Sequence, residues 1–426
     1  MFVLDTFGLP RVNFSDLVRR QGVTVVGFAC SVQRSAWEEP EGYQMRVHRA
    51  TITGCVAVLT LVLLACEMPR PPQGAGQAPA PPLTVRAGKV IDPGSAVLDL
   101  EQEGLKVWWR QQIGQIAEGK KLQDAYLLDN LLVVETRDAT LFYFDATTGV
   151  WTGATRLKSL LMAPPAAYEK VLYVPCERAL AVVDRESGQI QKRLRAMVPI
   201  SCQPLAYYNF LILCGGNGQV LCMDTEEGGE MWRGHADGAI ETPPLLYKEN
   251  LYVAGFRGRV VAINAHSGIE VWGWRPNAPS TLASGLAIGE GFLYVGDNRG
   301  FVYSLLPEEP VVTWKYPAGA PVSSIAPVRG RLLVFTHGSD ALCLDLNDEP
   351  PLRWKHADGQ QLIATGKTDA YLLTRDGSVA CVSLETGQEK WRLPLAEGCM
   401  VVSDSSKTAF YVLARDGAIM AIKELE

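Results

Sequence analysis

Between residues 105 and 426 the chain repeats one pattern eight times, at intervals of about forty residues. Each copy holds an apolar run, a turn dipeptide ending in Gly, a second apolar run, a turn with Gly, and a Trp four residues later. The end of the second apolar run marks the register: Asp145, Asp184, Asp224, Asn264, Leu305, Asp345, Ser383 and Lys423. A fixed period of this length predicts an array of similar structural units.

The runs within each unit are typical of β-strands. They are short, rich in aromatic and β-branched residues, and bounded by turn residues. Dipeptides such as Asn217-Gly218 and Asp376-Gly377 supply the positive φ that a tight hairpin needs. With the segment that enters each unit, every repeat contains four antiparallel strands. The sequence therefore predicts an all-β fold, an eight-bladed β-propeller of four-stranded antiparallel blades.

The Trp of the repeat is expected to pack between blades, where its large apolar face is removed from water. The residues assigned to this position are Trp108, Trp232, Trp272, Trp314, Trp354 and Trp391. In the early copies the signal fades, because Lys192 holds the equivalent place in the second repeat and Trp151 is out of phase. Stacking of a ligand on one of these rings is the alternative.

The two ends of the array are complementary. The eighth unit stops at Glu426, before its Gly and Trp, and the missing spacing occurs at the front as Gly104 and Trp108. We therefore expect the N-terminal strand, within residues 105–112, to complete the last blade and close the ring, which removes a free sheet edge.

The front of the chain has the features of a secretory signal. Residues 46–66 begin with two arginines, continue as a short apolar run, and end Leu63-Leu64-Ala65-Cys66. This end resembles the bacterial lipobox, which implies cleavage before Cys66 and lipidation of its sulfur; a signal-anchor helix is the alternative. We assign 1–44 as an upstream segment without a functional role, 45–65 as a lipoprotein signal peptide, 66–104 as a Pro-rich tether and lead-in, and 105–426 as the propeller.

Composition excludes several classes of function. A net charge of −6, with no long basic run in the repeats, disfavours a nucleic-acid partner.

Of the 10 cysteines, Cys222, Cys343 and Cys381 occupy a small apolar position of the repeat. Cys176 and Cys202 could form a disulfide, which the sequence leaves open.

No motif for catalysis is present. The five His residues show no metal-ligand spacing, and the tetrapeptide His-Ala-Asp-Gly, at 235–238 and 356–359, is explained by duplication of a turn. There is no phosphate-binding Gly loop and no nucleophile elbow. We predict no enzymatic activity, no cofactor and no metal.

The repeat resembles that of the pyrroloquinoline-quinone (PQQ)-like propellers over nearly all of 105–426. This resemblance leaves a quinoprotein dehydrogenase-like oxidoreductase as an alternative function. Those enzymes carry two adjacent cysteines over the quinone and long insertions that build the site. The chain has no adjacent cysteines and lacks such insertions.

An exported propeller of this repeat with no appended domain is similar to the BamB family of outer-membrane β-barrel assembly lipoproteins. The resemblance implies a scaffold that binds protein partners, such as the barrel-assembly complex, through loops joining consecutive blades. Here the corresponding loops are 194–204 and 233–243, with Arg195, Asp237 and Glu241 as candidate contacts; the first lacks the family's Arg-Gly turn. It further implies a lipid-anchored, periplasm-facing protein of the outer membrane, monomeric outside its complex. A PQQ-repeat lipoprotein with a different partner is the remaining alternative.

Overall fold

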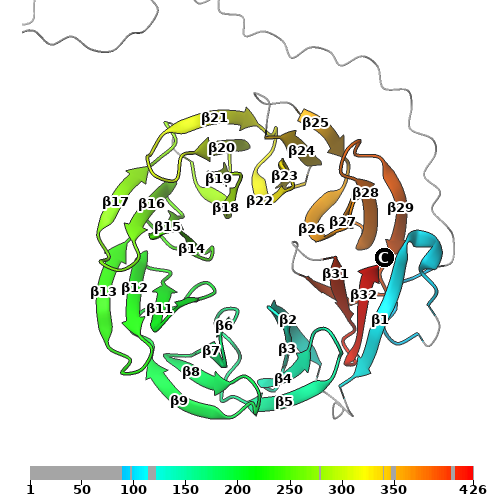
Figure 1. The fold of residues 1–426 in the computed structure, drawn as a ribbon, viewed down its shortest axis with the longest axis horizontal. Coiled ribbons are helices and arrows are strands. Elements are labelled where there is room, and N and C mark those ends of the chain that lie inside the picture. The colour runs from blue at the N-terminus through cyan, green and yellow to red at the C-terminus, as the bar shows by residue number, and fades with distance from the viewer. Residues whose placement is uncertain are drawn as a thin grey trace, which may run out of the picture. The chain divides into compact units, whose positions relative to one another are not determined.

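The computed structural model describes residues 89–95, 98–113, 121–277, 280–338, 340–346, 352–403 and 408–425. The proposed signal peptide, Cys66 and most of the tether lie outside these ranges. Within them the chain forms eight separate four-stranded antiparallel sheets and one short 3-10 helix, η1 (Glu101–Glu103). Figure 1 shows the sheets arranged as blades around a common axis. The eight-bladed β-propeller predicted from the repeat is confirmed. No helix in these residues is long and apolar enough to cross a membrane.

The strands of each blade follow one another from the centre of the ring outward. Blade 1 holds β2 (Leu122–Leu128), β3 (Leu131–Thr136), β4 (Thr140–Asp145) and β5 (Trp151–Arg156). Blade 2 holds β6 (Ala166–Tyr168), β7 (Val171–Cys176), β8 (Ala179–Asp184) and β9 (Ile190–Arg195). Blade 3 holds β10 (Leu205–Tyr207), β11 (Phe210–Cys214), β12 (Gln219–Asp224) and β13 (Glu230–His235). Blade 4 holds β14 (Leu245–Tyr247), β15 (Asn250–Gly255), β16 (Arg259–Asn264) and β17 (Glu270–Trp274).

The second half of the ring repeats this order. Blade 5 holds β18 (Leu282–Gly289), β19 (Phe292–Asp297), β20 (Phe301–Leu305) and β21 (Val312–Pro317). Blade 6 holds β22 (Val322–Val328), β23 (Arg331–Thr336), β24 (Ala341–Asp345) and β25 (Leu352–His356). Blade 7 holds β26 (Gly359–Thr365), β27 (Asp369–Thr374), β28 (Ser378–Ser383) and β29 (Glu389–Pro394). Blade 8 holds β30 (Met400–Ser403), β31 (Ala409–Leu413), β32 (Ala418–Glu424) and, from the front of the chain, β1 (Leu105–Gln112).

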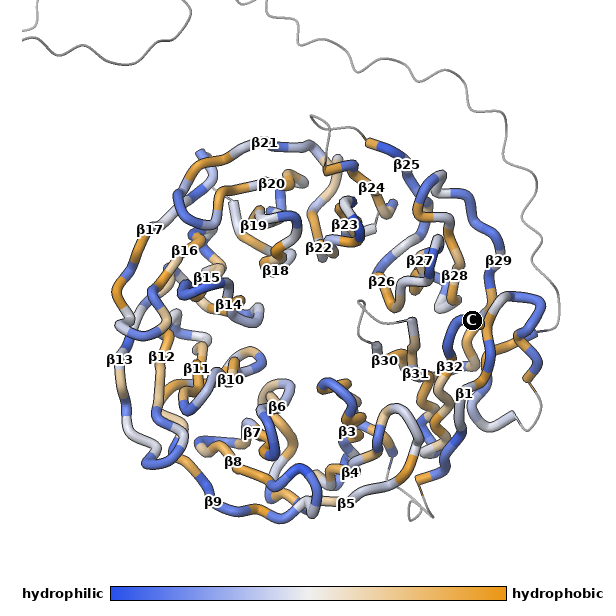
Figure 2. The backbone as a smooth tube through the Cα atoms, viewed as in Figure 1, coloured by the Kyte–Doolittle hydropathy of each residue, from blue (hydrophilic) through white to orange (hydrophobic). Residues whose placement is uncertain are grey.

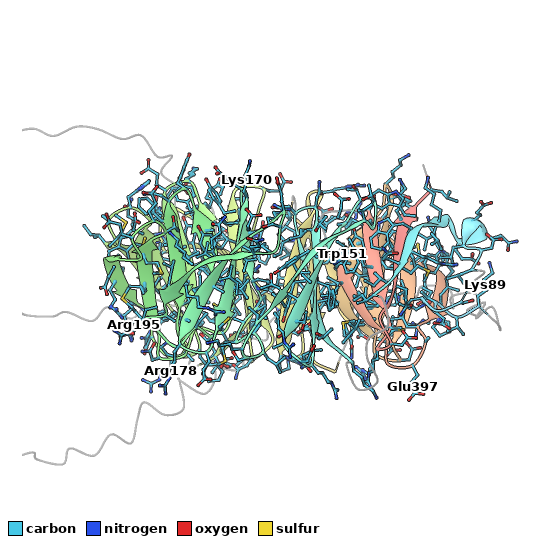
Figure 3. All side chains as sticks on the ribbon, turned by 90° about the horizontal axis from the view of Figure 1, so that it is seen from below. Lys89, Trp151, Lys170, Arg178, Arg195 and Glu397 are labelled. Carbon is cyan, nitrogen blue, oxygen red and sulfur yellow. The ribbon has the colours of Figure 1, made fainter. Side chains whose placement is uncertain are left out.

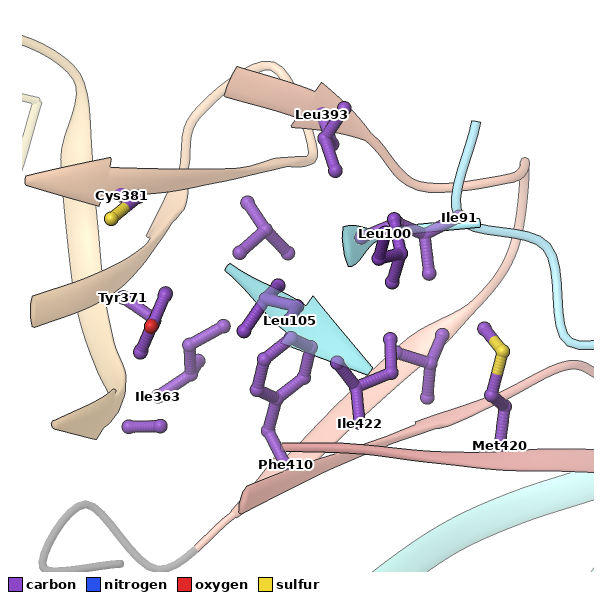
Figure 4. Close-up of a cluster of buried hydrophobic side chains, with 13 residues drawn as sticks. Ile91, Leu100, Leu105, Ile363, Tyr371, Cys381, Leu393, Phe410, Met420 and Ile422 are labelled. Atoms are coloured by element: carbon purple, nitrogen blue, oxygen red, sulfur yellow. The ribbon is translucent and has the colours of Figure 1, made fainter. Parts of the chain in front are cut away.

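Closure of the ring by the N-terminal strand is also confirmed. β1 pairs antiparallel with β32, from Leu105 opposite Glu424 to Gln112 opposite Ala418. Leu105 is fully buried in an apolar cluster that also contains Phe410 of blade 8 and Tyr371 of blade 7 (Figure 4). The first and last segments of the propeller therefore share one core, and β32 is not left as a sheet edge.

Polar groups fix the turn that follows each register residue. The carboxylate of Asp224 accepts the backbone N–H groups of Glu226 and Glu227, at 2.7 and 2.8 Å, and Gly228 then adopts a φ of 73°. Asp184 makes the same turn, and these donors lower the pKa of both carboxyl groups. An Asp followed four residues later by Gly is therefore a local signal for this five-residue hairpin.

The middle strands form the apolar core, and the outer strands face solvent. β11, β15, β19 and β23 are almost entirely buried, whereas β13 and β29 are largely hydrophilic (Figure 2). Each outer strand therefore has an exposed face, and its inward side chains contact the next blade.

The interface between two consecutive blades is called a seam here. At several seams a Trp side chain of the outer strand reaches across to the next blade. In four seams the Trp Nε1 donates to a backbone carbonyl beyond its own blade, at 2.9–3.0 Å: Trp232 to Ala265, Trp272 to Pro307, Trp354 to Leu384, and Trp391 to Glu103. Trp314 lies at the same strand position and packs on Tyr294, with 5.8 Å between ring centroids. The four hydrogen-bonded indoles contribute apolar burial and one satisfied hydrogen bond each, and Trp314 contributes an aromatic contact.

At the closing blade the crossing indole belongs to Trp109, and not to Trp108 as the Gly-to-Trp spacing suggested. Trp109 lies opposite Ala421 and donates from Nε1 to Ala146 O of blade 1 at 2.9 Å. Trp108 occupies the bulge between the paired residues Val107 and Trp109, and its ring lies 4.6 Å from Lys423 Nζ. The seam-crossing Trp is therefore five residues after Gly104 instead of four. This difference arises because β1 continues its pairing back to Leu105, whereas the other outer strands begin at a hairpin turn.

Candidate partner-binding face

The connections between blades and the turns between second and third strands lie at one end of the propeller, which we call the loop face. This follows from the strand order, because strands two and four of each blade end at the same side. Figure 3 shows Arg178, Arg195 and Glu397 along this side, and Lys170 on the opposite side. The loops 194–204 and 233–243 predicted as contacts are both on the loop face.

Arg195 is the last residue of β9 and presents an exposed side chain. Its backbone pairs with Ala179, so the position of the side chain is set by the sheet. After it, Val198 and Ile200 are 4% and 8% exposed and anchor the loop. In the part of the chain that the structure describes, Arg195 has no ion-pair partner, so its charge is available for contact with another molecule.

Asp237 and Glu241 differ in their surroundings, although they share one loop. The Asp237 carboxylate lies against two arginines of blade 4: Arg275 in direct contact and Arg257 at 3.8 Å. Glu241 is exposed, and the described residues contain no cation paired with it. Asp237 therefore has a structural role in seating the loop, and Glu241 is the more accessible acid. Arg257 belongs to the turn between β15 and β16, so its contact with Asp237 joins blade 4 to the loop from blade 3.

The two candidate loops touch each other at their bases. The Ser201 hydroxyl donates to Ile240 O, and Ile240 N donates to Gly215 O at 3.3 Å. Ile240 is fully buried. Arg195 and Glu241 are thus carried by loops that share a common anchor at the end of β11, so the loops form one continuous surface.

A glycine allows loop 233–243 to lie close on the sheet. A Cβ placed on Gly255, at the end of β15, would come within 2.3 Å of Asp237 O. Because this contact is with backbone, the loop would have to move away to admit any side chain. Gly255 therefore allows the loop to lie directly on the end of β15.

Further cations extend the surface over blades 1 and 2. Exposed basic side chains without ion-pair partners among the described residues stand in separate turns and connections of this face: Arg137, Arg156, Lys158 and Arg178. Among them, Leu160 and Met162 are 38% and 57% exposed. Two acidic residues, Asp138 and Glu177, lie in the same turns. This group of cations is not recognisable in the sequence, because each loop contributes only one or two of its members.

The connection that carries Leu160 and Met162 is tied to blade 1 by a buried acid. Glu135 is 2% exposed, and its Oε1 accepts the Leu161 N–H at 2.8 Å. Burial raises the pKa of Glu135, and the hydrogen bond from Leu161 opposes that rise. The connection is therefore held in place although two of its apolar side chains face solvent.

No arrangement typical of a metal centre occurs in the described ranges. They contain no group of three or more His, Cys, Asp or Glu side chains placed to hold a metal ion. A cavity of about 390 Å³ lies where blade 7 meets β1, lined by Glu103, Asp369, Lys390, Trp391 and Glu424 among others. Two of its acids are already paired, Glu103 with Lys89 at 3.0 Å and Asp369 with Lys390 at 2.6 Å.

Comparison with known proteins agrees with this architecture. Residues 199–393 match the family model described as outer membrane protein assembly factor BamB. No curated protein matches the chain in sequence.

Solved structures show the same fold at low sequence identity. The crystal structure of BamB from Moraxella catarrhalis superposes with a TM-score of 0.61 at 14% identity, over 75% of this chain and 97% of that one. The computationally designed Ika8 protein gives a TM-score of 0.58 at 13% identity, over 72% of this chain and 98% of its own. The chain has the β-propeller fold, shared with these structures. It resembles BamB in particular, by family model and by fold.

Proposed function

We propose that the protein is a non-enzymatic scaffold of outer-membrane β-barrel protein assembly, lipid-anchored through Cys66 and facing the periplasm. Its loop face binds a protein partner, the barrel-assembly complex. The match of residues 199–393 to an outer-membrane assembly factor supports the process. Loss of incorporated fatty-acid label in Cys66→Ser tests the anchor, and retention of label in that variant would contradict it.

One observation carries the choice of surface. On the loop face of blades 1 and 2, exposed arginines without ion-pair partners in the described structure occur together with exposed Leu160 and Met162, which follow Arg156 in the connection between these blades. Unpaired charge beside apolar area is typical of the core and rim of a protein–protein contact, in which arginine is enriched. A rigid propeller holds these loops at little additional entropic cost on binding.

The test is recovery of the barrel-assembly complex with tagged full-length protein from detergent-extracted membranes. We expect the double variant Arg178→Glu and Arg195→Glu to lower recovery at least fivefold, because charge reversal places like charges against the partner's surface. Glu241→Lys should have a smaller effect in the same direction. Exposed loop substitutions should leave the melting temperature almost unchanged.

The matched control is Lys170→Glu, which reverses an equally exposed charge on the opposite face (Figure 3). It should not alter recovery. Asp237 is unsuited to this test because its carboxylate is engaged by Arg275 and Arg257. If the wild-type protein recovers no barrel-assembly subunit, the proposed partner is wrong. If Lys170→Glu reduces recovery as much as the double variant, the proposed surface is wrong.

A further inference from the structure

Two buried cysteines lie at the base of the candidate loops: Cys202 in loop 194–204 and Cys214 at the end of β11. Cys202 and Cys214 are free, 3% and 1% exposed, and belong to the same apolar cluster. Their chain segments run side by side, since Ile200 and Gly215 form an antiparallel bridge. Ser201 N also donates to Cys214 O, at 3.1 Å. Cys214 therefore lies beside Ser201, the residue that precedes Cys202.

The side chains of the pair face each other. The Cys202 thiol is hydrogen-bonded to that of Cys214, and this contact together with burial raises the pKa of Cys214 well above its ordinary value. A disulfide needs Cα atoms about 4.4–6.8 Å apart. Cys214 lies opposite Ser201, so Cys202 is offset from it by one residue. A one-residue step of about 3.3 Å across segments about 4.5–5.5 Å apart gives a diagonal separation of roughly 6 Å. The backbone arrangement and the thiol contact therefore both fit a disulfide without a large rearrangement.

The other cysteines of the described structure are placed differently. Cys176, which the sequence left open as a partner of Cys202, packs in the cluster between blades 1 and 2. Cys202 packs between blades 3 and 4. Cys222 lies opposite Ile212 within blade 3, and Cys343 and Cys381 pack in clusters of later blades.

We propose that Cys202 and Cys214 form a disulfide when the protein folds in an oxidising compartment. The pairing rests on the export that the proposed function requires. The two thiols release two protons and two electrons, and one S–S bond forms. The electrons reduce the disulfide of a thiol–disulfide oxidoreductase, or oxidised glutathione, to two thiols.

Burial determines when this reaction can occur. Thiolate is the attacking species, and the raised pKa of Cys214 makes thiolate scarce in the folded protein. The bond therefore forms during folding, while both sulfurs are accessible, and then resists reduction in the native state. It ties the entry of blade 3 to the end of β11, directly under Ser201 and Ile240, and so fixes the base of both candidate loops.

The experiment uses the reduced, unfolded full chain, refolded in a buffer of reduced and oxidised glutathione. The folded fraction is isolated by gel filtration, alkylated with N-ethylmaleimide in denaturant, and mapped by mass spectrometry. Trypsin alone leaves Cys202, Cys214 and Cys222 in one peptide, since Arg195 and Arg233 are the nearest cleavage sites. Chymotrypsin must be added, because Tyr207, Phe210 and Leu221 separate the three cysteines.

We expect a Cys202–Cys214 cross-linked peptide as the main disulfide, with Cys222 alkylated. Oxidised protein should melt about 3–6 °C above reduced protein, because the bond closes a short loop in a large domain. The redox-dependent difference should vanish in Cys202→Ala and in Cys214→Ala. It should persist in Cys222→Ala, an equally buried cysteine of the same blade.

Alkylation of both Cys202 and Cys214 in the folded fraction would overturn the proposal, as would linkage of Cys202 to Cys176. These outcomes are independent of the proposed function, because refolding in glutathione needs neither export nor a partner. Failure of partner recovery with a mapped disulfide present would count against the scaffold function alone.

Discussion

The seam between blades 1 and 2 and the seam between blades 3 and 4 share a backbone design but differ in their side chains. At the second seam Trp232 covers Gly268 of the following turn, and a Cβ on that glycine would meet the indole at 2.6 Å. At the first seam Gly153 takes the place of the Trp, opposite Tyr143. There the Thr155 hydroxyl donates to Gly188 O, and Tyr143 Oη lies 2.7 Å from Thr155 Oγ1.

The next seam, between blades 2 and 3, is polar in another way. Lys192 stands at the Trp position, opposite Val182, and its Nζ donates to Glu226 O at 2.9 Å. This seam therefore retains the glycine of the turn, Gly228, and a side-chain donor to a backbone carbonyl, Lys192. It lacks the large apolar surface of an indole. Blades 1 and 2 also carry most of the unpaired cations of the loop face. We infer that inter-blade stabilisation is concentrated in the Trp seams, whereas blades 1 and 2 carry most of the contact surface proposed above.

The largest expected effect is at a Trp seam. Trp232→Ala removes an indole that is 8% exposed, together with its hydrogen bond to Ala265. We expect the free energy of unfolding to fall by about 3–5 kcal/mol. Urea denaturation of the purified protein measures it. Trp151→Ala is the control, since that ring is 55% exposed on blade 1 and its loss should cost less than about 1 kcal/mol. Equal losses in the two variants would contradict the contrast between the seams.

A seam that combines Trp with buried charge should depend on pH. Between blades 6 and 7, Glu389 accepts from Arg392 Nη2 at 2.9 Å and lies 2.8 Å from His356 Nε2. Burial opposes ionisation, but these partners outweigh it and lower the pKa of Glu389. Its ionised form therefore stabilises the fold above the ordinary carboxyl pKa, and this contribution is lost as pH falls through the lowered value.

The variant Glu389→Gln tests this dependence. It should lower the free energy of unfolding by about 2 kcal/mol at pH 7, as expected for hydrogen bonds to a charged group. The difference from wild type should shrink toward zero below about pH 4. Denaturation curves from pH 7 down to about pH 2 would show it. Glu397→Gln, which changes an exposed acid, is the control. A pH-independent difference would mean that the Glu389 charge is not what stabilises the seam.

The smallest effect should come from the polar seam. Thr155→Val keeps the shape of the side chain but leaves Tyr143 Oη and Gly188 O without their buried partner. We expect a loss of about 1–2 kcal/mol in the free energy of unfolding. Thr152→Val, on the outer edge of the same strand, is the control. A loss as large as that of Trp232→Ala would show that the polar seam stabilises the ring as strongly as an indole does.

Local patterns were sufficient for the fold. The Asp-to-Gly turns, the Gly dipeptides and the alternation of apolar runs each act over a few residues, and each occurs in the structure where the repeat placed it. The complementary ends of the array predicted ring closure for the same reason. Trp108 shows the limit of this reasoning. The four-residue Gly-to-Trp spacing holds where a hairpin precedes the outer strand, and it does not hold for β1, which no hairpin precedes.

The candidate site was only partly accessible from the sequence. Resemblance placed loops 194–204 and 233–243, and the structure puts both on the loop face. It did not distinguish Asp237, held by Arg257 and Arg275, from the accessible Glu241. The arginines come from different turns, so their contact with Asp237 depends on how one blade follows the next.

The sequence by itself determined the number of blades, their strand order and the closure by residues 105–112, because turn geometry and strand pairing depend on neighbours in the chain. The tertiary structure alone decided which residues meet across blades: Trp109 with Ala146, Asp237 with Arg275, and Cys202 with Cys214. Contacts of this kind depend on the shift of one strand by a single residue and on the path of a connection over the sheet. The forty-residue pattern determines neither the one-residue shift nor the path of the connection, because all eight copies share the pattern although they differ in these details.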